Sequence, residues 1–299
     1  MNLLILYSVL ILGSVAAGAA MILFVVAKKF KVDEDPRIDE VLDLLPGANC
    51  GGCGYAGCRA LAEALVKAAD EGDISALFCP PGGTETMSAV GKFLGVEAAE
   101  LAPAVAVVRC GGTREKAPAK LKYDGPAKCA LSHSLFTGEN NCPYRCLGLG
   151  DCVKACNFDA IHINGETSLP EVIEEKCTAC GACVRACPRN IIQLRPKGRK
   201  ERRVWVNCMN KEKGAVAGKN CKAACIGCGK CVKECPEKVR AITLKDNLAY
   251  IDPDKCITCG KCILVCPTGA IKATFTPPKP KPKPKPKPQP KPQSQEAPQ

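Results

Sequence analysis

The sequence has few of the side chains that perform acid–base catalysis or fill a large apolar core. Its 299 residues include two His, one Trp, five Tyr and seven Phe, against 27 Gly and 24 Pro. His133 and His162 stand apart, in a predicted polar loop and a predicted strand, so we expect both to be structural. No phosphate-binding loop is found, and no strand precedes the Gly-x-Gly-x-x-Gly match at residues 52–57. These features exclude an ordinary globular enzyme, and we predict no catalytic residue.

Cysteine is the residue in excess, with 24 copies, or about one residue in twelve. Domains with so little apolar bulk need another source of stability, and cysteines provide it as disulfides or as metal ligands. The location of the chain in the cell decides between these two roles, because disulfides are rare in a reducing cytoplasm.

An uncharged segment of 25 residues, 3–27, opens the chain. As a helix it would be about 37 Å long, enough to cross a bilayer. No Lys or Arg precedes the segment, which disfavours the alternative of a cleaved secretory signal. Lys28, Lys29 and Lys31 follow it directly. The positive-inside rule therefore predicts a single-pass protein of the cell (inner) membrane, with the remaining chain in the cytoplasm and metal ligands in place of disulfides.

The first cysteine group has the spacing C-x2-C-x4-C-x20-C and consists of Cys50, Cys53, Cys58 and Cys79. Glycines between the first three allow a tight turn around a metal group. A helix is predicted before the group, beginning at Asp35-Pro36 and ending before Pro46, and another at residues 59–71. Four thiolates suit zinc as well as a [4Fe–4S] cluster. The neighbouring motifs favour iron and sulfur.

The chain contains a tandem repeat with an offset of 79 residues, visible by subtraction in nine pairs of cysteines. The first copy has Cys129, Cys142, Cys146, Cys152, Cys156, Cys177, Cys180, Cys183 and Cys187, and the second has Cys208, Cys221, Cys225, Cys231, Cys235, Cys256, Cys259, Cys262 and Cys266. The runs follow C-x2-C-x2-C-x3-C-P, the pattern of bacterial two-cluster ferredoxins. Strands are predicted at 161–163 and 172–173 around an Asn164-Gly165 turn, and at 242–244 and 250–251 around an Asp246-Asn247 turn.

In such ferredoxins the fourth cysteine of each run binds the other cluster, which gives four predicted ligand sets. The second unit has Cys225, Cys228, Cys231 and Cys266 in one set, and Cys256, Cys259, Cys262 and Cys235 in the other. The first unit departs from the pattern, because Leu149 stands at the position of Cys228 and Asn157 replaces the usual Pro. We expect Cys142 as the substitute. Its sets are then Cys142, Cys146, Cys152 and Cys187, and Cys177, Cys180, Cys183 and Cys156.

Four cysteines remain: Cys110, Cys129, Cys208 and Cys221. They either complete a sixth cluster or are buried structural thiols, and the sequence leaves both open. Five [4Fe–4S] clusters are thus expected, or six, with no flavin or nucleotide on this chain. Each cluster with four thiolates carries about −2, so five or six offset about 10 to 12 of the positive charges. The formal charge of +12, of which the last 24 residues hold +5, therefore does not indicate a nucleic-acid partner.

The whole arrangement predicts an α+β protein built as a membrane-anchored polyferredoxin. Its predicted parts are a transmembrane anchor (1–27), a small helical [4Fe–4S] domain (28–95), a connector (96–128), two tandem ferredoxin-like units (129–199 and 200–275) and a disordered Lys-Pro tail (276–299). The tail alternates Pro with Lys and is expected to be a solvated polyproline II spacer, with contact to anionic lipid or an acidic partner as the alternative.

An apolar amino-terminal helix, then NCGGCGYAGC with a distant Cys79-Pro80, then CLGLGDCVKAC and paired ferredoxin runs together resemble the RnfB family, whose members are subunits of the Rnf complex, an ion-translocating ferredoxin:NAD+ oxidoreductase. The resemblance covers residues 1 to about 275. It implies an electron-transfer subunit of a translocase that takes electrons from reduced soluble ferredoxin and passes them to other membrane subunits, toward NAD+ and coupled to Na+ or H+ movement. The alternatives are a polyferredoxin subunit of another membrane oxidoreductase and a cluster-bearing activator of corrinoid proteins.

Overall fold

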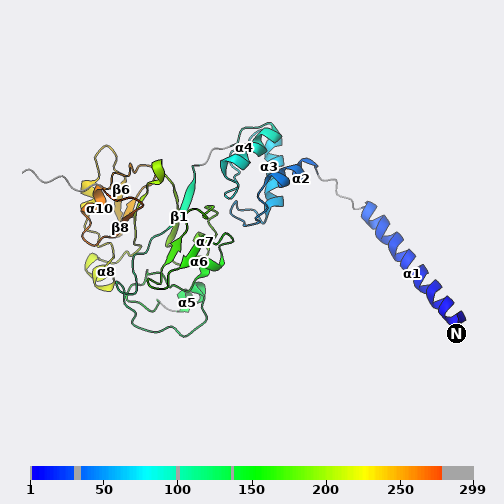
Figure 1. The fold of residues 1–299 in the computed structure, drawn as a ribbon, viewed down its shortest axis with the longest axis horizontal. Helices are drawn as coiled ribbons and strands as arrows, with labels where there is room; N and C mark the ends of the chain where they lie inside the picture. Colours follow the sequence, from blue (N-terminus) through cyan, green and yellow to red (C-terminus); the bar gives the residue numbers. More distant parts are fainter. Residues whose placement is uncertain (1, 30–34, 99–101, 136–137, 278–299) are drawn as a thin grey trace, which may run out of the picture.

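The computed structural model describes residues 2–29, 35–98, 102–135 and 138–277, with the side chains of 2–5 left out. The predicted tail from residue 278 onward lies outside the described residues. Figure 1 shows an isolated helix, a small helical domain and a larger body of short helices and strands. The expected mixed fold with one apolar amino-terminal helix is therefore confirmed.

Helix α1 (Asn2–Lys29) extends away from the rest of the chain, as Figure 1 shows. Within it, Leu6–Lys29 is the one segment of the described residues that is long and apolar enough to cross a membrane, and its side chains bury none of their surface against other parts of the chain. Its last turn carries Lys28 and Lys29. An exposed apolar helix of this length is unfavourable in water and needs a lipid or protein environment.

The small helical domain contains α2 (Arg37–Leu44), α3 (Cys58–Asp70) and α4 (Gly83–Leu94). Helix α2 begins as expected after Asp35-Pro36, and the Asp35 carboxylate accepts a hydrogen bond of 2.9 Å from the Arg37 backbone N–H. The apolar faces of the three helices enclose one core, in which Leu61, Leu65 and Met87 are completely or almost completely buried. Helix α4 was not predicted from the sequence.

The larger body contains two units with the same plan, each with an outer and an inner pair of antiparallel strands. In the first unit β1 (Ala104–Val108) pairs with β4 (Ile192–Pro196), and β2 (Ile161–Ile163) with β3 (Pro170–Val172). In the second, β5 (Val204–Val206) pairs with β8 (Ile271–Ala273), and β6 (Ile242–Lys245) with β7 (Leu248–Ile251). The inner pairs match the predicted strands to within a few residues, whereas the outer pairs were not predicted.

Short helices fill the spaces between these strands. They are α5 (Cys129–Leu135), α6 (Asp151–Lys154), α7 (Ala182–Arg185), the 3-10 turn η1 (Arg199–Glu201), α8 (Gly214–Asn220), α9 (Lys230–Glu234) and α10 (Lys261–Leu264). His133 lies exposed on α5, where a loop was expected, and His162 lies on β2 as predicted. The Asp246-Asn247 turn has the expected form, because both residues have positive φ, 49° and 58°.

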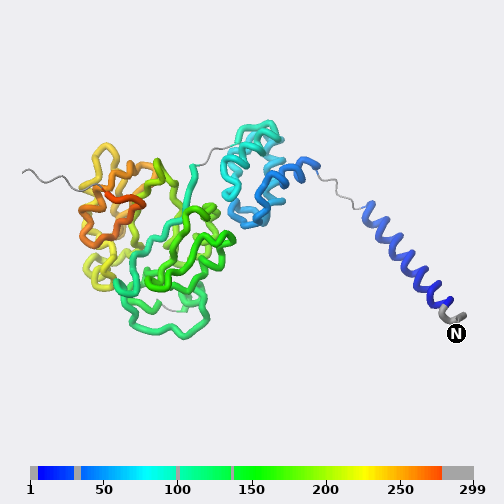
Figure 2. The backbone as a smooth tube through the Cα atoms, viewed as in Figure 1, coloured from blue at the N-terminus to red at the C-terminus, as the bar shows by residue number. Residues whose placement is uncertain are grey.

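The two units lie side by side, the first in green and the second in yellow and orange in Figure 2. Arg195 of β4 is almost completely buried at this contact, and its Nη2 donates to the Ile251 carbonyl of the second unit at 2.8 Å. The indole N–H of Trp205 donates in return to the Val108 carbonyl at 3.3 Å. The cysteines of the two units are therefore held in a fixed relation to each other.

Candidate iron–sulfur sites

The first cysteine group surrounds the amino end of α3. Cys50 and Cys53 lie on the loop before this helix, Cys58 is its first residue and Cys79 precedes α4. Asn49 closes the loop, because its Oδ1 accepts a 2.8 Å hydrogen bond from the Cys58 N–H. Burial raises the pKa of the Cys79 thiol, and the neighbouring thiols of the other three raise it further. The structure thus brings together the four thiols that the spacing groups as one ligand set.

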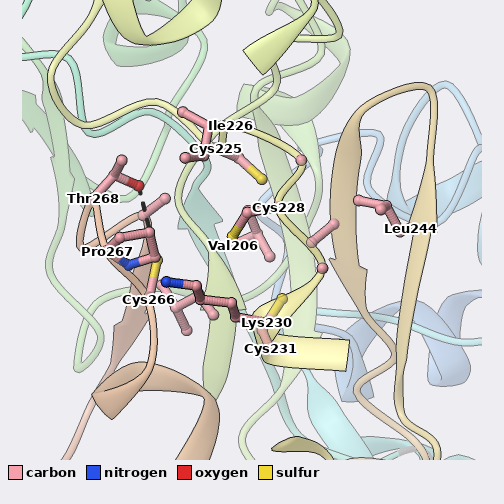
Figure 3. Close-up of a pocket in the computed structure, with 15 residues that line it drawn as sticks. Val206, Cys225, Ile226, Cys228, Lys230, Cys231, Leu244, Cys266, Pro267 and Thr268 are labelled. Carbon is pink, nitrogen blue, oxygen red and sulfur yellow. Dashed lines mark hydrogen bonds between the residues drawn. The ribbon is translucent and has the colours of Figure 1, made fainter. Parts of the chain in front are cut away.

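The second ferredoxin-like unit brings its eight predicted ligands into two neighbouring groups. Figure 3 shows Cys225, Cys228, Cys231 and Cys266 around one pocket, which encloses about 370 Å³. Burial raises the pKa of Cys231 to about 11, with further contributions from the other thiols of this group. Burial likewise raises the pKa of Cys262 to about 12, with contributions from Cys256 and Cys259 and a smaller one from Cys231. The two groups are therefore adjacent.

One group of the first unit also gathers as predicted. Cys156, Cys177, Cys180 and Cys183 line a pocket of about 350 Å³. Burial raises the pKa of Cys183 to about 11, and the other three thiols add to the rise. Short helix α7 carries Cys183 and begins at Gly181, whose φ of 73° allows the sharp turn into the helix.

The other group of the first unit differs from the expected one. Burial raises the pKa of Cys152 to about 12, and the neighbouring thiols that add most to the rise are Cys129 and Cys187. For Cys146, whose pKa burial also raises to about 12, the neighbours are Cys110, Cys152 and Cys129. Cys129 therefore lies with Cys146 and Cys152, on the helix α5 that the ferredoxin pattern does not contain.

Cys142, expected in that group, lines a separate pocket. This pocket encloses about 280 Å³ and contains four thiols, those of Cys110, Cys142, Cys208 and Cys221. All four side chains are buried. Burial raises the pKa of Cys142, and among its neighbours the thiols of Cys110 and Cys221 add to the rise. Three of the four cysteines left over from the ferredoxin runs thus meet Cys142.

Single metal ions are a poor match for these groups. Among the described residues, no group of three or more His, Cys, Asp or Glu side chains lies close enough around one point to hold one metal ion. A tetrahedral zinc site needs sulfur atoms about 2.3 Å from the ion. A cube of four irons and four sulfides is larger and spaces its four thiolates further apart, so the wider grouping favours iron–sulfur clusters over zinc.

Three family models match the chain, and all describe iron–sulfur domains. A 4Fe-4S dicluster domain matches residues 224–270, a 4Fe-4S binding domain matches residues 170–193 and an Fe-S cluster family matches residues 45–74. The expectation of [4Fe–4S] clusters is confirmed in this general form. Cys110, Cys142, Cys208 and Cys221 all lie outside the three matched ranges.

Three curated relatives, all of the B type among the subunits of their complexes, extend these matches over most of the chain. The chain is 47% identical over 233 residues to the relative from the Na(+)-translocating ferredoxin:NAD(+) oxidoreductase complex of Acetobacterium woodii, covering 78% of this chain and 67% of the relative. It is 41% identical to the relative from the proton-translocating ferredoxin:NAD(+) oxidoreductase complex of Clostridium ljungdahlii, covering 85% and 87%. It is 39% identical to the relative from the ion-translocating oxidoreductase complex of Methanosarcina acetivorans, covering 60% and 66%.

The chain belongs to the RnfB family. The resemblance noted in the sequence is confirmed, and the chain is a membrane-associated electron-transfer subunit of an Rnf-type complex. This identification sets aside the corrinoid activator and the subunit of an unrelated oxidoreductase.

In this member of the RnfB family, the helical domain contacts the first ferredoxin-like unit through a glycine. A Cβ atom placed on Gly52 would lie 2.8 Å from the Cβ of Cys180, so only glycine allows the two loops to meet here. The Arg185 guanidinium also reaches across, donating to the Gly51 carbonyl at 3.4 Å. Two predicted ligand sets, those of Cys53 and Cys180, are therefore carried on loops in direct contact.

A basic hollow opens beside the last ligand set. It encloses about 990 Å³ and reaches Cys256, with Arg199, Arg202 and Lys255 exposed in its lining and Asp254 as its one acidic residue. Arg203, at its base, is buried and forms an ion pair with Glu174. The net positive charge of this wall favours an acidic surface over a neutral or basic one.

Two other polar residues at the thiol groups were not singled out in the sequence. Asn210 is completely buried, and its backbone N–H and side-chain amide lie 3.4 Å from Cys208 Sγ and 3.5 Å from Cys142 Sγ. Arg145 is also buried and lines the same pocket. No motif distinguishes either residue from its neighbours. A shared Val-x-Cys at residues 108–110 and 206–208 was the available signal for the pocket itself.

Proposed function

We propose that this chain accepts electrons from a reduced soluble ferredoxin and passes them, one at a time, through its clusters to other subunits of a membrane complex. Those subunits would carry the electrons to NAD+ and couple their flow to the movement of Na+ or H+. The names of the relatives support this reaction, since two of them are subunits of ferredoxin:NAD(+) oxidoreductases. Clusters held by four cysteines supply one-electron chemistry of low potential when bound.

The observation that carries the proposal is that the ligand sets form a continuous series. The set of Cys53 meets that of Cys180 at Gly52, and Cys183 of the latter group adds to the raised pKa of Cys152 in the next. In the second unit, Cys231 adds to the raised pKa of Cys262, so its two sets adjoin as well. Electron transfer between clusters needs such proximity. The chain's own residues therefore act by fixing cluster positions and by limiting the access of water.

Electrons would enter at the basic hollow beside Cys256. A reduced cluster bound by four thiolates carries net negative charge, and a carrier that exposes such a cluster near its surface is attracted by Arg199, Arg202 and Lys255. Cys256 lines the hollow, so a docked carrier comes close to a ligand of the last set. The opposite end of the series, at Cys50 and Cys53, would deliver electrons to the membrane subunits.

The orientation in the membrane follows from the lysines at the end of α1. Lys28 and Lys29 occupy its last turn and Lys31 follows in the sequence, which favours a single span with the cluster domains on the cytoplasmic side. The domain boundaries at residues 95, 128, 199 and 275 and the solvated Lys-Pro tail are part of the same proposal. Reduced ferredoxin is then on the same side as the basic hollow.

The test is ferredoxin-driven NAD+ reduction in membrane vesicles from the source cell, with and without the gene for this chain. Deletion should abolish the activity, and an ionophore should change the rate in the intact strain. Complementation with the wild-type gene and with Cys58→Ser separates two causes, because the variant keeps the chain in the membrane while removing a ligand. Unchanged activity after deletion would refute the assignment.

A further inference from the structure

Four cysteines meet in a pocket that the ferredoxin pattern does not account for. Cys110, Cys142, Cys208 and Cys221 line it, and each is less than a tenth exposed. Its volume of about 280 Å³ is close to the 350 and 370 Å³ of the two ferredoxin pockets, each of which is also lined by four cysteines. In number of thiols, burial and size, this pocket matches the predicted cluster sites.

The repeat explains why these four cysteines meet. Cys110 follows strand β1 by two residues, and Cys208 follows β5 by two residues. Before Cys110, Arg109 N–H donates to the Ile191 carbonyl at 2.6 Å, and before Cys208, Asn207 N–H donates to the Ala270 carbonyl at 2.7 Å. Residues 191 and 270 are 79 apart, which is the repeat offset. Cys110 and Cys208 therefore occupy equivalent positions in the two units.

Cys142 and Cys221 form the second equivalent pair, again 79 residues apart. Each unit thus contributes the same two cysteines to the pocket, and the four thiols are related by the internal duplication. Such a site lies at the contact between the units and is complete only when both are present. Chance burial of four unrelated thiols has no reason to follow the symmetry of the repeat.

Cys129 has no partner in this symmetric set and lies elsewhere. Ala130 N–H donates to the Asp151 carboxylate at 3.0 Å, and the Lys154 ammonium donates to the Ala127 carbonyl at 3.1 Å. These bonds hold α5 against α6, which carries Cys152. Leu149 stands where the second unit has Cys228. Cys129 therefore lies where the first unit lacks a thiol.

We propose that Cys110, Cys142, Cys208 and Cys221 bind a sixth [4Fe–4S] cluster between the two ferredoxin-like units, and that Cys129 is the fourth ligand of the cluster on Cys146, Cys152 and Cys187. This assignment of ligands concerns the isolated chain and goes beyond the proposed function. It replaces the expectation, made from spacing, that Cys142 belongs with Cys146.

The surroundings of the pocket fit a cluster of net negative charge. Asn210 directs two N–H groups at the sulfurs of Cys208 and Cys142, and hydrogen bonds to thiolate sulfur stabilise the charged cluster. Arg145 lines the pocket, is only 4% exposed, and has one guanidinium nitrogen, Nη2, without a hydrogen-bond partner. A buried positive charge is costly unless a negative group lies nearby, and a four-thiolate cluster provides one.

The sixth cluster would join the two units into one electron path. Cys110 Sγ accepts a hydrogen bond of 3.4 Å from the Cys146 N–H, so the pocket touches the first unit's set. On its other side, burial raises the pKa of Cys208 to about 12, while a hydrogen bond from the Cys225 backbone opposes the rise. Cys225 belongs to the second unit's set, and the pocket therefore lies between the two.

Iron and acid-labile sulfide counts on the full-length protein, purified without oxygen in detergent, test the proposal. Six clusters require about 24 iron and 24 sulfide atoms per chain, and five require about 20 of each. The wild-type count needs no variant, so it holds even if a variant does not fold. About 20 irons together with one zinc would overturn the proposal by making the pocket a zinc site, and about 20 irons without zinc would leave only buried thiols.

Paired serine variants test which cysteines share a cluster. Cys142→Ser and Cys208→Ser should each remove about four irons, and the double variant should also remove about four, since both changes affect one cluster. Cys142→Ser with Cys146→Ser should remove about eight, whereas Cys129→Ser with Cys146→Ser should remove about four. The reverse result for the last two pairs would overturn the assignment. Iron counts do not involve ferredoxin or NAD+, so failure here is distinct from failure of the proposed function.

Discussion

Replacing Gly52 with alanine should separate the helical domain from the first ferredoxin-like unit. The new Cβ would lie 2.8 Å from Cys180 Cβ, 2.9 Å from its carbonyl oxygen and 3.0 Å from its Cα. Atoms in ordinary contact are about 3.5–4.0 Å apart, so the loops must move apart by about 1 Å. Two of the three atoms belong to the backbone, and no side-chain rotation relieves the clash.

The magnitude follows from the cost of overpacking, about 1–3 kcal/mol for an extra methyl group in a filled site. The hydrogen bond across this contact, from Arg185 to Gly51, is long at 3.4 Å and cannot hold the loops together against such a cost. A change of this size shifts the equilibrium between docked and separated domains roughly 5- to 150-fold.

Two measurements on the purified full-length chain detect the separation. Amide hydrogen exchange at residues 50–54 should increase, and electron exchange between the cluster of Cys53 and that of Cys180, followed by freeze-quench EPR, should slow while the iron content stays unchanged. Gly165→Ala is the matched control, because a Cβ there meets nothing within 4 Å. Wild-type exchange and wild-type electron transfer in Gly52→Ala would refute the view that this contact lies on the electron path.

Three further predictions concern single sites. Cys228→Ser should remove about four irons per chain and leave α1 and the cluster of Cys53 intact; a full iron content would contradict the ligand set of Figure 3. Arg199→Glu should lower the rate of reduction by ferredoxin at low salt by about tenfold, with little change at high salt, while Lys92→Glu on α4 serves as the control; equal rates for both variants would place the docking surface elsewhere. In cluster-free protein, burial raises the pKa of Cys262 to about 12, so alkylation should be slow at pH 8 and still increase above pH 10, unlike that of exposed Cys228; equal labelling rates at pH 8 would contradict the buried, protonated thiol.

Much of the fold was predictable because cysteine spacing and helix signals are local. The Asp35-Pro36 start, the alanine-rich helix and the inner strand pairs of each unit depend on neighbours within a few residues. The outer pairs β1–β4 and β5–β8 are different, since Val108 meets Ile192 and Val206 meets Ile271 across 84 and 65 residues. Strands of three to five residues with such distant partners have no periodic signal long enough to be found in one sequence.

The candidate sites show the same division. Ligand sets within one run, such as Cys177, Cys180 and Cys183, follow from the spacing. The position of Cys142 does not, because the sequence places it four residues from Cys146 while the chain turns its side chain into another pocket. Proximity in sequence favoured the local grouping, and the fold decided between two thiols at comparable distances.

An insertion accounts for both departures of the first unit. The segment between Cys110 and Cys142 has 31 residues, and the equivalent segment between Cys208 and Cys221 has 12. The difference of 19 equals the difference between the offset of Cys110 and Cys208, 98, and the repeat offset, 79. Cys129 lies in this longer segment, so its alignment with Cys208 is a coincidence of numbering. The segment that breaks the repeat is the one that brings a thiol to the set in which Leu149 provides none. Loss of that segment should therefore cost the first unit one cluster while the symmetric pocket keeps all four of its cysteines.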